Sequence, residues 1–204
     1  MKLLLTSDGL SNEKLQKTFL DLLEIPLKEI KILMIALPRS DREKYYIQET
    51  KKELWDLGID PDNITMFSLK KRRMSDDDLS EFNVIYVCGG NNFFILNTLR
   101  EIKFLQKIKQ LVKKGILYVG VSAGSIMAGP SIEIAGWGSE ADENDTESTN
   151  FSALNFTEIT ILPHYHKELE KEVNDFRKKF KLNTLPLMDG QALLINGKEE
   201  KVIR

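Results

Sequence analysis

Short apolar runs alternate with amphipathic stretches of helix length, and this alternation constrains the fold more than any other feature of the sequence. Most of the runs are continuously apolar, as in "IKILMIAL", and do not alternate polar with apolar residues. Continuous runs are typical of strands that helices cover on both faces, as in a parallel sheet. We therefore predict an α/β fold with a single doubly wound, mostly parallel sheet and helices on both faces. The predicted strands are residues 2–7, 30–37, 64–69, 84–89, 116–121, 158–163, 185–188 and 192–196.

The stretches between these runs have the spacing of helices that pack on a core. Leu15 and Phe19, for example, are four residues apart, and we expect them to be buried. The segment "SDRE" (40–43) has the pattern of a capping box and predicts a helix that runs to about Leu57, where Gly58 would end it.

Length and charge exclude several classes of protein. The chain has 204 residues, which suits one domain, and we place it at residues 1–204. A formal net charge of -2 gives no electrostatic reason to bind nucleic acid or anionic lipid. The basic run 70–73 is followed by acids at 76–78, which is typical of a solvated surface turn.

Cysteine usage and hydropathy indicate where the protein works. Cys88 is the single cysteine, which excludes an internal disulfide and a multi-cysteine zinc site and points to a reducing compartment. The apolar run at the start is too short for a signal peptide, and no apolar run reaches the length of a membrane span. We expect a cytoplasmic protein with no metal and no organic cofactor.

One region breaks the alternation. Residues 129–155 are rich in glycine, serine and acids, and they are too polar for a core element and too long for a plain connection. Two interpretations stay open, a loop near the active site or a mobile insertion at the surface.

Polar residues and glycines gather where the predicted strands end. Open α/β sheets bind their ligands at the carboxyl ends of their strands, so these residues would share one edge of the sheet. They include a hydroxyl, an imidazole, a carboxylate and a glycine pair, which are the parts of a serine hydrolase. The strand-end residues are Thr6-Ser7-Asp8-Gly9, Gly89-Gly90-Asn91-Asn92, Ser122-Ala123-Gly124, His164-Tyr165-His166 and Asp189-Gly190.

Ser122 is the candidate nucleophile. It is the central residue of "GVSAG" (120–124), which fits the G-x-S-x-G pattern of a nucleophile elbow. In such an elbow a sharp turn from strand to helix exposes the serine hydroxyl, and small residues are needed because the backbone is strained and neighbouring strands crowd it. The alternative is a serine that caps a helix.

A serine nucleophile needs a base, and histidine is suited to this because its unperturbed pKa lies near 6.5. The chain has two histidines. His164 directly follows a predicted strand and is the expected base, whereas His166 is a candidate substrate-binding residue. The acid that orients the imidazole is Asp189 or Asp142, and we favour Asp189 because it lies on the rigid scaffold.

Backbone amides are the expected donors to an oxyanion. Ala123 follows the nucleophile, and Gly89 or Gly90 supplies the second amide, with Asn91 beside them as a candidate substrate-binding residue. This glycine turn could instead bind a phosphate, although it lacks the lysine-serine pair of a P-loop. Cys88 is expected to be a buried, inert thiol.

Several segments resemble the peptidase E (alpha-aspartyl dipeptidase) and cyanophycinase family of serine peptidases. The resemblance implies a flavodoxin-like fold similar to that of class I glutamine amidotransferases, with Ser122 as nucleophile and His164 as base. In this family the acid has been assigned both to the loop before the histidine and to the strand end after it. Here the basic insertion that helps aspartyl dipeptidases recognise aspartate is missing. The segments are "VIYVCGGNNFFILNTLR", "KKGILYVGVSAGSIMAGPSI" and "ALNFTEITILPHY".

The sequence therefore predicts a serine peptidase that hydrolyses dipeptides or short peptides through an acyl-enzyme. Aspartyl dipeptidase activity and a homodimer both stay open. The alternative from another class is a non-catalytic binding protein on the same fold. A weaker alternative is an amidotransferase-like enzyme that uses Cys88, which does not lie at the elbow.

Overall fold

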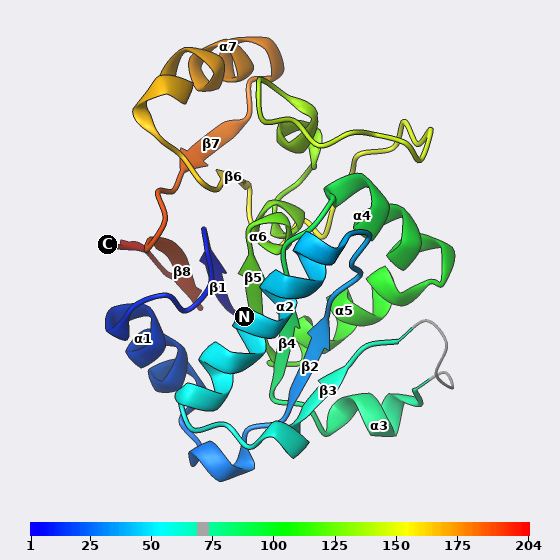
Figure 1. The fold of residues 1–204 in the computed structure, drawn as a ribbon, viewed down its shortest axis with the longest axis vertical. Coiled ribbons are helices and arrows are strands. Elements are labelled where there is room, and N and C mark those ends of the chain that lie inside the picture. Colours follow the sequence, from blue (N-terminus) through cyan, green and yellow to red (C-terminus); the bar gives the residue numbers. More distant parts are fainter. Residues whose placement is uncertain (69–73) are drawn as a thin grey trace.

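A computed structural model describes residues 1–68 and 74–204 of the chain. Its centre is a seven-stranded sheet in the order β3-β2-β4-β5-β1-β8-β9 (Figure 1). Strands β3 to β1 in this order pair in parallel, and β8 and β9 pair antiparallel at one side. The strands are β1 (Lys2–Thr6), β2 (Ile32–Ile35), β3 (Ile64–Met66), β4 (Val84–Val87), β5 (Leu117–Val121), β8 (Ala192–Asn196) and β9 (Glu199–Ile203).

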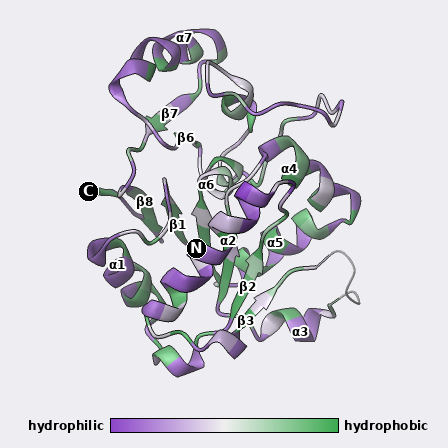
Figure 2. Cartoon of the chain, in the orientation of Figure 1, coloured by the Kyte–Doolittle hydropathy of each residue, from purple (hydrophilic) through white to green (hydrophobic). Residues whose placement is uncertain are grey.

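Helices cover both faces of this sheet, as the continuous apolar runs predicted. In β4, Ile85 packs with helices α4, α5 and α6, and the next residue, Tyr86, packs with α1 and α2 on the other face. The strands are the most hydrophobic part of the chain, and α7 is mostly hydrophilic (Figure 2). The helices are α1 (Glu13–Leu23), α2 (Asp41–Asp56), α3 (Asp76–Ser80), α4 (Asn92–Glu101), α5 (Phe104–Lys113), α6 (Ala123–Ala128) and α7 (Glu170–Phe180), with 3-10 turns at Leu27–Glu29, Pro61–Asn63, Glu133–Gly136 and Lys167–Leu169.

The α/β class and the mostly parallel sheet are confirmed, but the expectation of one sheet for all strands differs from the structure. Strands β6 (Ile159–Leu162) and β7 (Asn183–Pro186) pair with each other in a separate two-stranded parallel sheet. The reason is that β8 occupies the position beside β1, so the main sheet ends in an antiparallel hairpin there. Figure 1 shows β6, β7 and α7 together beyond one end of the main sheet.

The predicted helix cap and strand bounds differ from the structure in several details. Ser40 caps α2 by accepting from the Glu43 backbone N–H, but the Glu43 carboxylate accepts from the Arg39 N–H and does not close the capping box. Strand β7 ends two residues before the predicted run 185–188 does, and β9 was not predicted. The basic run 70–73 and the last residue of the predicted strand 64–69 lie outside the described residues. No helix in the described ranges is long and apolar enough to cross a membrane.

Candidate active site

The turn that carries Ser122 has the strained geometry of a nucleophile elbow. Ser122 follows β5 with φ 49° and ψ -107°, a conformation that residues other than glycine seldom adopt. A Cβ on Gly120 would lie 2.6 Å from the Gly124 carbonyl, and one on Gly124 would lie 2.2 Å from the Val87 carbonyl oxygen. Both glycines are therefore required by close backbone packing. The Ser122 side chain makes no capping hydrogen bond to α6, which contradicts the helix-cap alternative.

Buried hydroxyls hold the elbow against β1. Ser125 Oγ donates to the Thr6 carbonyl at 2.7 Å and to the Gly120 carbonyl at 2.8 Å, and the Ser122 N–H donates to the Thr6 carbonyl at 3.1 Å. Tyr118 Oη donates to the Gly124 carbonyl at 2.7 Å. Each hydroxyl is buried, and these bonds satisfy backbone oxygens in the tight turn.

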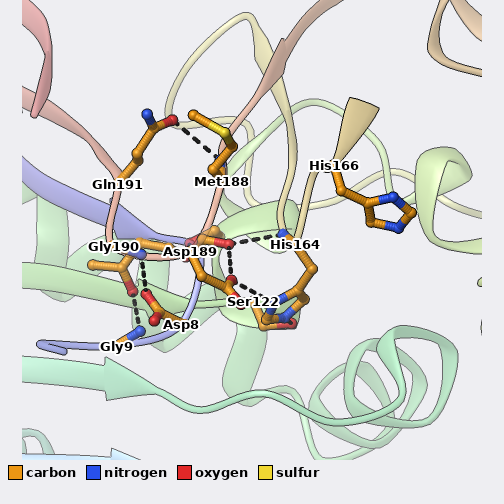
Figure 3. Close-up of polar contacts among 12 residues, drawn as sticks. Asp8, Gly9, Ser122, His164, His166, Met188, Asp189, Gly190 and Gln191 are labelled. Carbon is orange, nitrogen blue, oxygen red and sulfur yellow. Dashed lines mark hydrogen bonds and ion pairs between the residues drawn. The ribbon is translucent and has the colours of Figure 1, made fainter. Parts of the chain in front are cut away.

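His164 lies between Ser122 and Asp189 (Figure 3). Its Nε2 is 2.9 Å from Ser122 Oγ, and its Nδ1 is 2.8 Å from Asp189 Oδ1. Because an ionised carboxylate only accepts hydrogen bonds, Nδ1 carries the proton in this pair, and Nε2 of the neutral ring is left to accept from the serine hydroxyl. The three side chains thus have the order and spacing of a catalytic triad.

The two candidate acids lie in different environments. Asp189 follows β7 and contacts His164, whereas Asp142 Oδ2 accepts from the backbone N–H of Asn92 at 2.8 Å and from its Nδ2 at 2.9 Å. The turn after Asp189 is fixed by the Gly190 N–H, which donates to Asp8 Oδ1 at 2.9 Å. Of the two, the structure brings Asp189 to the histidine.

Ser7 connects the main sheet to His164 and Asp189, a role that no specific pattern in the sequence indicates. Its Oγ donates to Asp189 Oδ1 at 2.8 Å and accepts from the His164 backbone N–H at 2.7 Å. Ser7 is fully buried at the end of β1. Its place among the strand-end residues was the one available hint.

The glycine turn after β4 lies beside Ser122. A Cβ on Gly89 would be 3.5 Å from Ser122 Cβ, and Gly90 has a φ of 140° and lines the cavity that contains Ser122. Within residues 1–68 and 74–204, the backbone N–H groups of Gly90 and Ala123 have no hydrogen-bond acceptor. These two amides are available to a ligand.

The cavity at Ser122 is small, about 160 Å³, and lies between the main sheet and α7. The loop 129–155 contributes Trp137, Glu140 and Asp142 to its wall, which favours the interpretation of this loop as part of the site. Helix α7 adds Glu172 and Val173, which sequence reasoning did not identify because their helix was treated as core alone.

The two predicted substrate-binding residues do not line the cavity. Asn91 caps α4, accepting from the Phe94 N–H at 2.9 Å and donating to the Glu143 carbonyl at 2.8 Å, and its neighbour Asn92 takes the place at the cavity. Asn91 is the N-cap of α4, which begins at Asn92, and its side chain is engaged in these two hydrogen bonds.

His166 points away from Ser122 (Figure 3). Its Nδ1 lies 2.7 Å from Glu168 Oε2 and its Nε2 lies 3.2 Å from Glu140 Oε1. Hydrogen bonds to Glu168, and then to Glu140, raise the pKa of His166 above its usual 6.5. His166 is therefore a surface bridge to the loop that carries Glu140.

Cys88 cannot replace Ser122. It is buried with Tyr86 on the opposite face of the sheet, and burial raises the pKa of its thiol to about 12. A thiol with so high a pKa is a poor nucleophile, which argues against the amidotransferase-like alternative. Among the described residues, no group of three or more His, Cys, Asp or Glu side chains is arranged to hold a metal ion.

Comparison with known proteins identifies the family. The model of Peptidase family S51 matches residues 3–203. An uncharacterized peptidase of Pasteurella multocida is 28% identical over 171 residues, which are 81% of this chain and 80% of that protein. Peptidase E of a Nostoc species is 30% identical over 139 residues, which are 68% of this chain and 53% of that protein.

Solved structures agree with this match. A crystal structure of a Listeria monocytogenes protein assigned to peptidase E aligns with a TM-score of 0.78 and 25% identity, over 100% of this chain and 98% of that one. A peptidase from an acI-B1 Actinobacterium shares the fold, with a TM-score of 0.70 and 17% identity. The chain described above therefore belongs to peptidase family S51, a family of serine peptidases.

Proposed function

We propose that this serine peptidase hydrolyses dipeptides or short peptides with Ser122 as nucleophile, His164 as base and Asp189 as the acid that orients the imidazole. The observation that carries the proposal is the hydrogen-bonded series from Ser122 Oγ through the His164 ring to Asp189 Oδ1. The small volume of the cavity supports short substrates. No metal or organic cofactor enters the mechanism.

The reaction proceeds in two halves. Ser122 Oγ attacks the scissile carbonyl carbon while its proton passes to His164 Nε2, and the Gly90 and Ala123 amides receive the oxyanion. His164 then gives this proton to the leaving amine as the C–N bond breaks, which leaves an acyl-enzyme on Ser122. Water, deprotonated by His164, hydrolyses the ester and releases the acid product.

A dipeptide library tests the proposal. The purified chain is incubated with each peptide and new amino groups are measured, with Ser122→Ala as the matched control. We expect hydrolysis of some peptides by the wild type and none above background by the variant. Equal hydrolysis by the two proteins, or no hydrolysis of any member of the library, would contradict the proposed function.

A further inference from the structure

Asp189 lies on an exposed turn, so packing of its own side chain does not fix the carboxylate. It follows the end of β7 at Pro186, and its side chain is 60% exposed. The hydrogen bond of 2.8 Å between Asp189 Oδ1 and His164 Nδ1 nevertheless requires a defined position of that oxygen. Other parts of the chain must therefore hold the backbone around Asp189.

The two peptide groups that follow Asp189 are both held by the segment after β1 (Figure 3). The Gly190 N–H belongs to the peptide group that directly follows the Asp189 Cα, and it donates to Asp8 Oδ1 at 2.9 Å. The Gly190 carbonyl belongs to the next peptide group and accepts from Asn12 Nδ2 at 3.0 Å. Because Gly190 has a φ of 79°, in the left-handed region, no regular hydrogen-bond ladder orients this turn. The bond to Asp8 fixes the peptide group nearest to Asp189.

Asp8 can hold this turn because its own segment is fixed between β1 and α2. The next residue, Gly9, is buried, and its N–H donates to Thr6 Oγ1 at 3.1 Å. The carboxylate of Glu53, on α2, accepts from the Leu10 N–H at 3.4 Å, and a Cβ on Gly9 would lie 3.0 Å from Glu53 Oε2. The position of the main sheet is therefore transmitted through Asp8 to the turn that carries Asp189.

Asp8 has no direct route to the reacting groups. In the described part of the chain it makes no hydrogen bond or ion pair with His164 or Ser122. A rotation of the peptide group after Asp189 would move its Cα–Cβ bond and carry Oδ1 away from the imidazole. A displacement of about 1 Å in a catalytic group can cost about 100-fold in rate.

We propose that Asp8 is a positioning residue of the active site, whose carboxylate fixes the peptide group after Asp189 and thereby keeps Asp189 Oδ1 in line with the His164 ring. What Asp8 supplies is an acceptor for a neutral backbone N–H, and its charge is not required. The inference rests on the proposed function for the part that Asp189 plays in hydrolysis. The effect on the bond between Asp189 and His164 does not depend on that function.

Two substitutions of Asp8 separate the acceptor from the charge. Asp8→Ala removes the acceptor, and kcat should fall about 10- to 100-fold while KM changes by less than about threefold. Asp8→Asn removes the charge and keeps an oxygen that can accept from the Gly190 N–H, so kcat should stay within about threefold of the wild type. Steady-state kinetics on the best peptide of the library measure both. An unchanged kcat in Asp8→Ala, or an equal loss in Asp8→Asn, would overturn the inference.

Asp60→Ala is the matched control. Asp60 Oδ1 accepts from the Asp62 backbone N–H at 2.9 Å, which is the same kind of bond at the same distance, in a 3-10 turn that does not line the cavity. Its loss should leave kcat unchanged. A fall in kcat as large as that of Asp8→Ala would show a general effect of losing such a bond and would overturn the assignment to Asp8.

NMR of the histidine ring nitrogens gives a measurement that needs no substrate. The chain has two histidines, and His166→Gln assigns their signals. At about pH 9, above the usual histidine pKa, the neutral His164 ring should carry its proton on Nδ1 in the wild type and in Asp8→Asn. In Asp8→Ala part of the population should shift to the form protonated on Nε2, because the acceptor at Nδ1 is no longer held in place.

The NMR result distinguishes the two possible failures. A wild-type ring protonated on Nε2, or the same proton distribution in Asp8→Ala as in the wild type, would overturn the inference. If the wild type hydrolyses no peptide but Asp8→Ala shifts the proton, the proposed function fails and the positioning role of Asp8 stands. If peptides are hydrolysed and Asp8→Ala changes neither kcat nor the proton, the inference alone fails.

Discussion

Ser122 and His164 are neighbours in space, but different kinds of structure hold them. Ser122 lies on the main sheet, between β5 and α6, where backbone atoms pack so closely that Gly120 and Gly124 have no room for a side chain. His164 follows β6 in the small sheet, its side chain is 45% exposed, and the hydrogen bonds that it donates to Asp189 and Ser7 position it.

Backbone packing therefore positions Ser122, whereas side-chain hydrogen bonds position His164. The position of Ser122 depends on a turn that many backbone contacts enforce, so the loss of a single hydrogen bond should matter little there. The position of His164 depends on a few polar contacts across two sheets, and Ser7 makes the contacts that link the sheets. Substitutions around Ser122 and around His164 test this contrast.

Ser122 and His164 should be equally necessary for hydrolysis. Ser122→Ala removes the proposed nucleophile and His164→Ala removes the proposed base, and each should lower kcat by roughly 10⁶, because members of a triad act as a unit. Steady-state kinetics on the best peptide of the library measure this. Retention of more than a tenth of the activity in either variant would contradict the assignment.

Asp189→Asn should lower kcat by about 10⁴, because the amide no longer holds the histidine in the tautomer with Nδ1 protonated. Asp142→Asn changes the same charge in the loop and should affect KM more than kcat. A comparison of the two variants by steady-state kinetics identifies the acid. Similar, mild losses of kcat in both would exclude Asp189 from this role.

Gly124→Ala tests the backbone packing around Ser122. Its Cβ would lie 2.2 Å from the Val87 carbonyl oxygen, so α6 must move, and we expect a loss of about 1–3 kcal/mol in the free energy of unfolding. A displaced elbow should also lower kcat/KM by about 100-fold. Gly197→Ala is the control, because apart from its chain neighbours no atom of the described residues lies within 4 Å of a Cβ placed there, and the cost of the change is conformational alone. Denaturant unfolding and kinetics that do not distinguish the two variants would refute the packing argument.

Substitution of two serines compares the surroundings of His164 with those of Ser122. Ser7→Ala removes the hydroxyl that contacts both Asp189 and His164, and kcat should fall about 10- to 100-fold. Ser125→Ala removes two hydrogen bonds on the nucleophile side, yet the Thr6 and Gly120 carbonyls keep other donors, so we expect a smaller loss. The contrast fails if Ser125→Ala costs as much kcat as Ser7→Ala.

His166→Gln should have the smallest effect, about threefold or less on kcat/KM, because its contacts with Glu140 and Glu168 are exposed. The pKa of His166 is raised in the folded state, so its stabilising contribution is complete below the unfolded value and disappears as pH rises through the folded value. Thermal denaturation should therefore separate variant and wild type at pH 5.5 and not at pH 9. A larger difference at pH 9 would be inconsistent with this bridge.

Much of the fold could be predicted because buried parallel strands leave continuous apolar runs. The edge strand β9 was missed since "EEKVI" (199–203) is mostly charged and does not form such a run. The separate pairing of β6 with β7 depends on which strand takes the place beside β1, and no local pattern contains that information.

The meeting of Ser122 and His164 could be predicted because each directly follows a predicted strand and has a side chain suited to hydrolysis. The choice between Asp189 and Asp142 depends on the path of a long loop, which spacing does not define. Asn91 and Asn92 differ by one position at a helix start, and the phase of that helix decides which one caps it and which one reaches the cavity.

We propose that His164 activates Ser122, and reaction with a fluorophosphonate probe measures this activation, since an unactivated serine does not react. Mass spectrometry of the labelled protein should find one phosphonyl group, on Ser122, and no labelling of Ser122→Ala or His164→Ala. No labelling of the wild type, as expected of a binding protein on the same fold, or equal labelling of His164→Ala would contradict the account.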